Sequence, residues 1–459
     1  MNAPTPSPPA GRLRPSLRRG RYGWYLLQRP VLRDGHAVTL LRGGAQLFPA
    51  MCAAIAAAQR EVWLATYIFN DDEQALVVAD ALVAAAARGV RVRVVIDGFG
   101  TKHSRSRIEQ RLAASPGIAV ETGRPSRRLQ LAVFRPIERW THWLQPGQLR
   151  RLHMKLCTVD DTVGYIGGIN LIDDHVDLNH GRTEAPRLDY ALAVSGPVVE
   201  TMRQVVRAMW SRAWHGSDWR DALRRLVVAP QPMQRLRGLL RELRMPLRPG
   251  AEGVADGQPP GGSSPAATMR AALVVRDNVR QRRTIERACV EAMRGAQRRI
   301  WLVTPYFYPG TGFRLALADA ARRGVEVRLL LQGKADYRLA AWAARALYRE
   351  LHQHGVHIHE YLPAFLHAKV MLIDDDWCTV GSSNIDPLSL LLNLEANLIV
   401  SDAGFCATLA TELEGAMADS REVLPDSLRE AGWVRLARRA VVAWVAYVYL
   451  RVAGVTGRY

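Results

Sequence analysis

The chain has 459 residues, of which 48% are hydrophobic, and a formal net charge of +19 at pH 7. This length predicts two or three domains, and the charge favours a polyanionic partner, either nucleic acid or an anionic membrane surface. Five cysteines without CxxC spacing argue against a zinc site or a disulfide framework. No apolar run reaches the roughly eighteen residues of a spanning helix, so we expect none.

The elements repeat along the chain. Residues 1–30 are rich in Pro, Ser and Arg, and we expect a disordered basic arm rather than a signal peptide. Residues 31–215 then read as helix, apolar strand, Ala-rich helix and apolar strand, followed by a short histidine–lysine signature. Residues 267–425 repeat this order, so the sequence predicts two similar α/β domains.

The repeat extends to short matching segments. Arg88-Gly89-Val90 in the first half matches Arg323-Gly324-Val325 in the second, each before an apolar strand. Gly89 and Gly324 are further apart in the sequence than His153 and His367 are, so the first half has more residues between its glycine and its histidine. The first half therefore carries extra residues, which we place in 127–150.

Two regions outside the repeat are basic. Residues 216–266 combine leucines at helical spacing among arginines with a Gly-, Pro- and Ser-rich stretch, which predicts a basic helix and a flexible linker. That helix either packs on a domain or lies at a membrane interface. Residues 426–459 contain an apolar run, 440–450, flanked by arginines. This tail forms either a membrane-surface helix or a terminal helix docked on the core.

The signature occurs twice with identical spacing. The copies are His153, Lys155, Asp160 and Asn170, then His367, Lys369, Asp374 and Asn384. The chain contains only four lysines, and two of them lie in these copies. Chance therefore does not explain the repeat.

The residue types of the signature suit phosphodiester chemistry. We expect each copy to begin on a strand, where residues i and i+2 face the same way, so that His153 and Lys155 point into one cleft. If the two halves face each other, one neutral histidine can attack phosphorus while the other protonates the leaving alkoxide. The lysines, with Asn170 and Asn384, would stabilise the transition-state charge. We expect no metal and no cofactor, since two lysines would compete with a cation.

Four carboxylates are candidates for supporting roles. A nucleophilic histidine needs an acceptor for its Nδ1–H, and Asp189 and Glu395 follow the two signatures at suitable places. Asp189 could instead be a solvated carboxylate at a strand end. Asp160 and Asp374 complete the signature, but their position at strand ends favours turn capping or ion pairing over catalysis.

The other two lysines occupy matching places after apolar strands. Lys102 follows Gly98-Phe99-Gly100-Thr101, and Lys334 follows Gln332-Gly333. The carboxyl ends of strands line the cleft in α/β sheets, so these lysines could bind a headgroup phosphate. An equally plain interpretation is two exposed loop lysines.

The duplicated signature resembles that of the phospholipase D superfamily, whose hallmark is this HKD motif. Residues 381–390 running into 393–397, together with 306–310, are similar to the B-type subfamily of bacterial cardiolipin synthases. The resemblance covers residues 38–200 and 271–405.

The resemblance implies two pseudo-twofold-related domains, each a mixed β-sheet flanked by helices, with a single active site at their interface. It also implies transfer of a phosphatidyl group from one phosphatidylglycerol to another through a phosphohistidine, giving cardiolipin and glycerol. His153 would be the nucleophile and His367 the general acid. The partners would be phosphatidylglycerol and the anionic cytoplasmic face of a bacterial inner membrane, bound peripherally.

Two other functions use the same residues. A phospholipase D-type hydrolase or a metal-independent nuclease would share the catalytic core, although the sequence contains no recognised nucleic-acid module and we expect no nucleic-acid partner. A membrane-binding protein with a decayed site is the third alternative, against which two intact signatures argue. The sequence leaves the oligomeric state open.

Overall fold

The computed structural model describes residues 30–113, 128–145, 147–214, 269–277, 281–334, 345, 347–386, 389 and 392–424. The predicted basic arm except for Pro30, the predicted linker 216–266 and the tail 426–459 lie outside these ranges. Their predicted structures therefore stay predictions.

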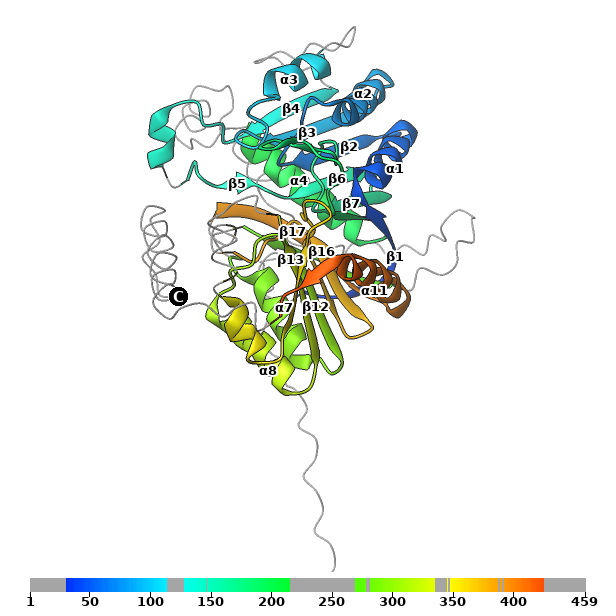
Figure 1. Cartoon of the computed structure of the whole chain (residues 1–459). Helices are drawn as coiled ribbons and strands as arrows, with labels where there is room; N and C mark the ends of the chain where they lie inside the picture. Colours follow the sequence, from blue (N-terminus) through cyan, green and yellow to red (C-terminus); the bar gives the residue numbers. More distant parts are fainter. Residues whose placement is uncertain are drawn as a thin grey trace, which may run out of the picture.

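The described helices and strands follow the predicted alternation (Figure 1). In chain order they are β1 (Arg33–Arg42), α1 (Gly43–Ala57), β2 (Glu61–Thr66), α2 (Glu73–Ala87), β3 (Arg91–Asp97), α3 (Arg105–Ala113), β4 (Leu129–Phe134), the 3-10 helix η2 (Trp140–Leu144), β5 (Arg151–Leu152), β6 (Lys155–Val159), β7 (Val163–Gly167), β8 (Val176–Asp177), β9 (Gly181–Arg182), β10 (Tyr190–Ser195), α4 (Val198–Trp214), β11 (Met269–Arg276), α7 (Thr284–Gly295), β12 (Arg299–Thr304), α8 (Thr311–Arg322), β13 (Glu326–Gln332), β14 (His357–Tyr361), β15 (Val370–Ile373), β16 (Trp377–Gly381), β17 (Asn393–Ser401), α11 (Ala403–Ala418) and β18 (Ser420–Glu422).

Each half contains one mixed sheet with the same strand order. The N-terminal half runs β1-β10-β7-β6-β2-β3-β4, and the C-terminal half runs β11-β17-β16-β15-β12-β13-β14, to which β18 is added. Strands β2, β3 and β4 are parallel, as are β12, β13 and β14, while the other pairs of both sheets are antiparallel. Strands β1 and β11 pair and join the two sheets. The predicted α/β class and internal repeat are confirmed.

The repeated Arg-Gly-Val tripeptide has a structural reason. Gly89 follows α2 with φ +102°, and Gly324 follows α8 with φ +88°. This left-handed conformation ends a helix readily when the residue is glycine, because no Cβ opposes it. In each half the chain can therefore turn from the helix directly into the next parallel strand.

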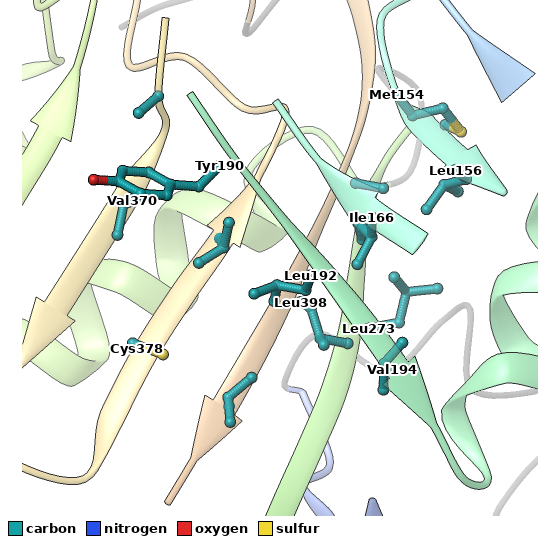
Figure 2. Close-up of a cluster of buried hydrophobic side chains, with 14 of the residues drawn as sticks. Met154, Leu156, Ile166, Tyr190, Leu192, Val194, Leu273, Val370, Cys378 and Leu398 are labelled. Atoms are coloured by element: carbon teal, nitrogen blue, oxygen red, sulfur yellow. The ribbon is translucent and has the colours of Figure 1, made fainter. Parts of the chain in front are cut away.

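The hydrophobic residues form three cores. Helices α1 and α2 cover one face of the N-terminal sheet, and α7 and α8 cover the corresponding face of the C-terminal sheet. The third core is shared: it combines the inner faces of both sheets with α4 and α11. Figure 2 shows Leu192 and Val194 of β10 beside Leu273 and Leu398 of the other half. Since a fully buried leucine or valine contributes about 1.5–3 kcal/mol, this shared core holds the halves together.

The prediction that residues 127–150 form an insertion needs correction. Leu129–Phe134 within it is β4, a sheet strand that pairs in parallel with β3 and has β14 as its counterpart. Residues 135–152 then connect β4 to His153, whereas residues 362–366 make the same connection in the C-terminal half. Many of the extra residues therefore follow β4. Its apolar residues lie among arginines, which hid the strand in the sequence.

Candidate active site

The two signature histidines lie just before strands rather than on them. His153 lies between β5 and β6, and His367 precedes β15, so the predicted position on a strand was wrong by a few residues. The reason is a backbone contact with the opposite half. The amide of His153 donates to Leu394 O at 3.0 Å, and the amide of His367 donates to Leu188 O at 2.8 Å. Each histidine is thus fixed by the half to which it does not belong.

Short parallel pairings extend these contacts. Strand β5 pairs with β17, so that Leu152 lies opposite Leu394. Leu188 forms the corresponding isolated bridge with Leu366. Both histidines therefore enter the site from segments that are hydrogen-bonded across the domain interface.

Two side chains at the ends of matching strands support these segments. Asp97 at the end of β3 accepts from Leu152 N at 2.7 Å, and Gln332 at the end of β13 accepts from Leu366 N at 2.7 Å. Sequence reasoning did not identify either residue. Their signal was present, because they occupy matching places in the repeat, directly before Gly98 and Gly333.

Each histidine is also paired with a carboxylate of the other half. The Nδ1 of His153 lies 3.0 Å from Glu395 Oε2, and the Nδ1 of His367 lies 2.6 Å from Asp189 Oδ2. Both carboxylates are almost completely buried. With a carboxylate as acceptor, Nδ1 carries the proton and Nε2 is the reactive nitrogen. Asp189 and Glu395 were predicted as acceptors, but the crossed pairing was not.

The two carboxylates have different surroundings. Glu395 receives a hydrogen bond from Ser382 Oγ, and its Oε1 lies 3.4 Å from Nη2 of the buried Arg276. Burial would raise the pKa of Glu395, but His153 and Arg276 lower it to about 2. In the described part of the chain, the only side chain that forms an ion pair with Asp189 is His367. Glu395 therefore shares its charge with an arginine, whereas the charge of Asp189 acts on both His367 and Lys369, which lower the pKa of this carboxyl.

The signature lysines lie close to their histidines. Lys155 Nζ donates to His153 O at 2.7 Å, and Lys369 Nζ donates to His367 O. Burial and the charge of Lys369 lower the pKa of Lys155 to about 7, and burial lowers the pKa of Lys369 to about 8. Lys155 also lies 5.5 Å from the ring centroid of Tyr67, a residue that sequence reasoning missed.

The two signatures act on each other electrostatically. Burial lowers the pKa of His153 to about 4, and Lys369 of the other half contributes in the same direction. Burial, Lys369 and also Lys155 of the other half lower the pKa of His367 to about 3. Each signature lysine is thus near enough to the histidine of the other half to lower its pKa, which supports the predicted meeting of the two signatures between the halves.

The signature asparagines are buried beside this place. Asn170 Oδ1 accepts from Ile68 N at 3.3 Å, which leaves its Nδ2 donors for a ligand. Asn384 Oδ1 has no hydrogen-bond partner among the described residues. Together with the lysines, these amides provide donors suited to the oxygens of a phosphate group.

Comparison with known proteins agrees with this geometry. A family model described as cardiolipin synthase, PLD-like domain, matches residues 51–183 and 289–417. The chain belongs to this cardiolipin synthase family. It is 33% identical over 429 residues to cardiolipin synthase B of Escherichia coli K12, covering 91% of this chain and 89% of that protein.

Further relatives support the family and the fold. Cardiolipin synthase A of Pseudomonas putida GB-1 is 29% identical, over 88% of this chain and 73% of that protein. The crystal structure of phosphatidylserine synthase from Haemophilus influenzae superposes with a TM-score of 0.60 and 13% identity, covering 92% of this chain and 96% of that one. That likeness shows the fold, and it extends over both halves.

Within this cardiolipin synthase-family fold, the signature aspartates lie away from the histidines. Asp160 follows the end of β6, accepts from the amides of Gln59, Arg60 and Glu61 at 2.6–2.9 Å, and has φ +52°. Asp374 has φ +51° and accepts from the amides of residues 297–299 in the same way. These contacts support turn capping rather than a catalytic role.

Replacing Asp160 by alanine is expected to lower the free energy of unfolding by about 1–3 kcal/mol, because three amides lose their acceptor. Alanine also tolerates a positive φ poorly, whereas asparagine tolerates it, so Asp160→Asn should cost less. Urea denaturation of both variants measures the difference. If Asp160→Ala keeps its full stability but loses activity, Asp160 has a catalytic role and the turn-capping interpretation is wrong.

The remaining lysines and the other charged groups add two observations. Lys102 and Lys334 are both exposed, and Lys334 Nζ donates to Pro363 O at 3.0 Å. Their predicted role in headgroup binding stays a prediction. In the described part of the chain, no three His, Cys, Asp or Glu side chains are grouped as metal ligands, and no helix has the length and apolar character to cross a bilayer.

Proposed function

We propose that the chain is a cardiolipin synthase that transfers a phosphatidyl group between two phosphatidylglycerol molecules. Family membership supports phospholipid substrates and a phosphatidyltransferase reaction. The observation that carries the mechanism is the pair of crossed histidine–carboxylate contacts, His153 with Glu395 and His367 with Asp189, beside two buried lysines.

The first step forms a covalent intermediate. Nε2 of neutral His153 attacks the donor phosphorus, and the bond from phosphorus to the glycerol oxygen breaks. Protonated His367 gives its proton to that oxygen, so glycerol leaves as a neutral alcohol. Lys155, Lys369 and the asparagine amides stabilise the negative charge on the non-bridging oxygens.

The second step reverses the chemistry with a new alcohol. A hydroxyl of the second phosphatidylglycerol gives its proton to neutral His367, and its oxygen attacks the phosphohistidine phosphorus. The nitrogen–phosphorus bond breaks, which releases cardiolipin and restores His153. No group is consumed, so the enzyme is ready for another donor.

We assign His153 as the nucleophile by the resemblance to the phospholipase D superfamily, and the two histidine–carboxylate pairs have different surroundings. Arg276 shares the charge of Glu395, which weakens the stabilisation of a protonated His153. Asp189 pairs with His367, but Lys369 also lowers the pKa of this carboxyl, so neither carboxylate serves its histidine alone. With pKa values of about 4 for His153 and about 3 for His367, both histidines are neutral before substrate binds, and the assignment rests on the resemblance to the superfamily.

Substrate binding would raise the pKa of His367, so that this histidine takes up the proton it later donates. In the empty site both histidines have a pKa well below 7, partly because two lysines repel a further positive charge. A phosphodiester anion between the lysines offsets this repulsion and raises the pKa of a neighbouring histidine. The acid is thus formed only when the substrate is present.

Anion binding should therefore depend on pH. Lys155 and Lys369 have a lowered pKa of about 7 and about 8, and a bound anion raises both values. Affinity for inorganic tungstate, a phosphate mimic, is expected to be highest at pH 6 and to decline through pH 7, where the free Lys155 ammonium begins to lose its proton. It should fall by about tenfold or more per pH unit above pH 8, because each neutral lysine must first take up a proton. Calorimetric titrations between pH 6 and 9 measure this, and a constant affinity would contradict it.

We also propose that the protein acts at the cytoplasmic face of a bacterial inner membrane. Its net charge of +19 suits an anionic lipid surface. The proposal follows from the lipid substrate, and the relatives named above are bacterial proteins.

Product analysis tests the proposed reaction. Purified protein incubated with phosphatidylglycerol vesicles, with and without a chelator, should form cardiolipin and free glycerol in equal amounts in both samples. Phosphatidic acid without cardiolipin would instead indicate a hydrolase. Cleavage of DNA in the presence of chelator would indicate a nuclease.

A further inference from the structure

Each half contains a small cavity at the same place, beside its signature lysine and between the sheet and its first helix. The N-terminal cavity is bordered by Lys155 and α1, and its volume is ≈ 20 Å³. The C-terminal cavity is bordered by Lys369 and α7, and its volume is ≈ 40 Å³. Only the second is also lined by a signature asparagine, Asn384.

The two cavities differ in chemistry at equivalent positions. Strand register aligns Gly167 with Gly381, and the repeat aligns the helices that precede β2 and β12. Four of the aligned lining pairs differ in size or polarity in one direction: Met51 and Cys289, Tyr165 and Thr379, Ile169 and Ser383, and Ala191 and Asn397. At these four pairs the C-terminal half has the smaller or the more polar side chain, whereas Val303 and Met371 are larger than their counterparts Ala65 and Cys157. The C-terminal cavity is the larger of the two and has polar groups where Ile169 and Ala191 line the N-terminal one.

Two buried polar atoms at the C-terminal cavity have neither a hydrogen bond nor an ion pair among the described residues. They are Nε of Arg276 and Oδ1 of Asn384, whereas Nη2 of Arg276 lies 3.4 Å from Glu395 Oε1. Arg276 is 1% exposed and Asn384 is 6% exposed. An unsatisfied buried donor or acceptor costs about 1–3 kcal/mol, so such atoms in one cavity indicate a polar occupant.

The lining defines the chemistry of that occupant. A bare anion would meet the Asn384 oxygen and the Glu286 carboxylate, and a bare cation would meet Arg276 and Lys369. A neutral polyol satisfies both groups, because each hydroxyl donates and accepts. The cavity has room for about three water molecules. A short polyol with three hydroxyl groups would occupy a similar space.

We propose that this cavity is the acceptor subsite, which binds the glycerol headgroup of the incoming phosphatidylglycerol. The inference rests on the proposed function and deepens it. Lys369 and Asn384 belong both to the cavity and to the phosphate site, so a polyol held there lies beside the phosphorus. It lies in the half that contains His367, the histidine that accepts the proton of the acceptor hydroxyl.

A single substitution can close the subsite. Cys289→Met introduces a methionine into the C-terminal cavity, as Met51 occupies the equivalent position in the N-terminal cavity. The assay uses phosphatidyl-p-nitrophenol as donor and free glycerol as acceptor, so that nitrophenolate release reports formation of the intermediate. Transfer to glycerol, divided by nitrophenolate release, is expected to fall about tenfold, with phosphatidic acid formed instead.

Matched variants control this experiment. Met51→Cys makes the reverse exchange in the N-terminal cavity and should leave the transfer ratio unchanged. Thr379→Val removes the lining hydroxyl that accepts from Asn397 Nδ2 at 3.2 Å, with little change of shape, and should lower the ratio if Cys289→Met does not fold. An unchanged ratio in folded Cys289→Met or in Thr379→Val would overturn the proposal.

Glycerol binding without turnover separates this inference from the proposed function. Saturation-transfer NMR on the His153→Ala protein should detect bound glycerol, and adding Cys289→Met should abolish the signal. If phosphatidylglycerol yields no cardiolipin while this signal and its loss are seen, the proposed function fails and the subsite remains. If cardiolipin forms but glycerol binding survives in Cys289→Met, the subsite is wrong.

Discussion

Alanine in place of His153 or His367 is expected to lower cardiolipin formation by about 10⁴-fold or more. The two variants should differ when the donor carries p-nitrophenol, which leaves without needing a proton. His367→Ala should then still release nitrophenolate and accumulate the phosphoprotein, because the nucleophile is intact. His153→Ala should do neither. Acid-quenched mass spectrometry detects the covalent adduct.

His103→Ala is the control for these variants, since His103 is exposed and lies outside the site. Its activity should equal that of the unchanged protein. An adduct in His153→Ala, with none in His367→Ala, would reverse the assignment of nucleophile and acid. Substantial cardiolipin formation by either variant would refute a shared site.

The second large effect concerns the carboxylates. Asp189→Asn and Glu395→Gln should each lower cardiolipin formation by about 10⁴-fold, because an amide no longer holds the required histidine tautomer. Because each carboxylate contacts the histidine of the other half, each variant should show the same nitrophenolate release as the alanine variant of that histidine. With the nitrophenyl donor, Asp189→Asn should behave like His367→Ala and keep nitrophenolate release. Glu395→Gln should behave like His153→Ala and lose it.

Asp376→Asn is the matched control, because this carboxylate is exposed and follows the β15 turn. Circular dichroism and thermal unfolding establish that the variants are folded. If Asp189→Asn loses nitrophenolate release while Glu395→Gln keeps it, each carboxylate serves the histidine of its own half. The crossed arrangement would then be wrong.

Much of the site could be predicted because the repeat marks it. His153, Lys155 and their counterparts stand at identical spacing, and a duplicated motif with two lysines out of four leaves little room for coincidence. The α/β class followed from apolar strands between helical patterns. Gly89 and Gly324 marked the repeat in the sequence, and the structure adds that both have the positive φ that ends a helix.

Other features depend on contacts between distant residues. The Nδ1 partner of His153 lies 242 positions away, on the other half, and no local pattern records that distance. Strand β4 was hidden because its apolar residues lie among arginines, and only pairing with β3 reveals it. Arg276 is one arginine among many in the sequence, and only its burial beside Glu395 distinguishes it.

The crossed contacts also determine when the protein becomes active during its synthesis. His153 leaves the ribosome long before Glu395, which is the partner that fixes its tautomer. A growing chain that has folded only its first domain therefore carries a histidine without its acceptor, and His367 does not yet exist. Nascent or prematurely terminated chains are thus inert toward the cell's own lipids, and activity begins only once β17 has been made and docked.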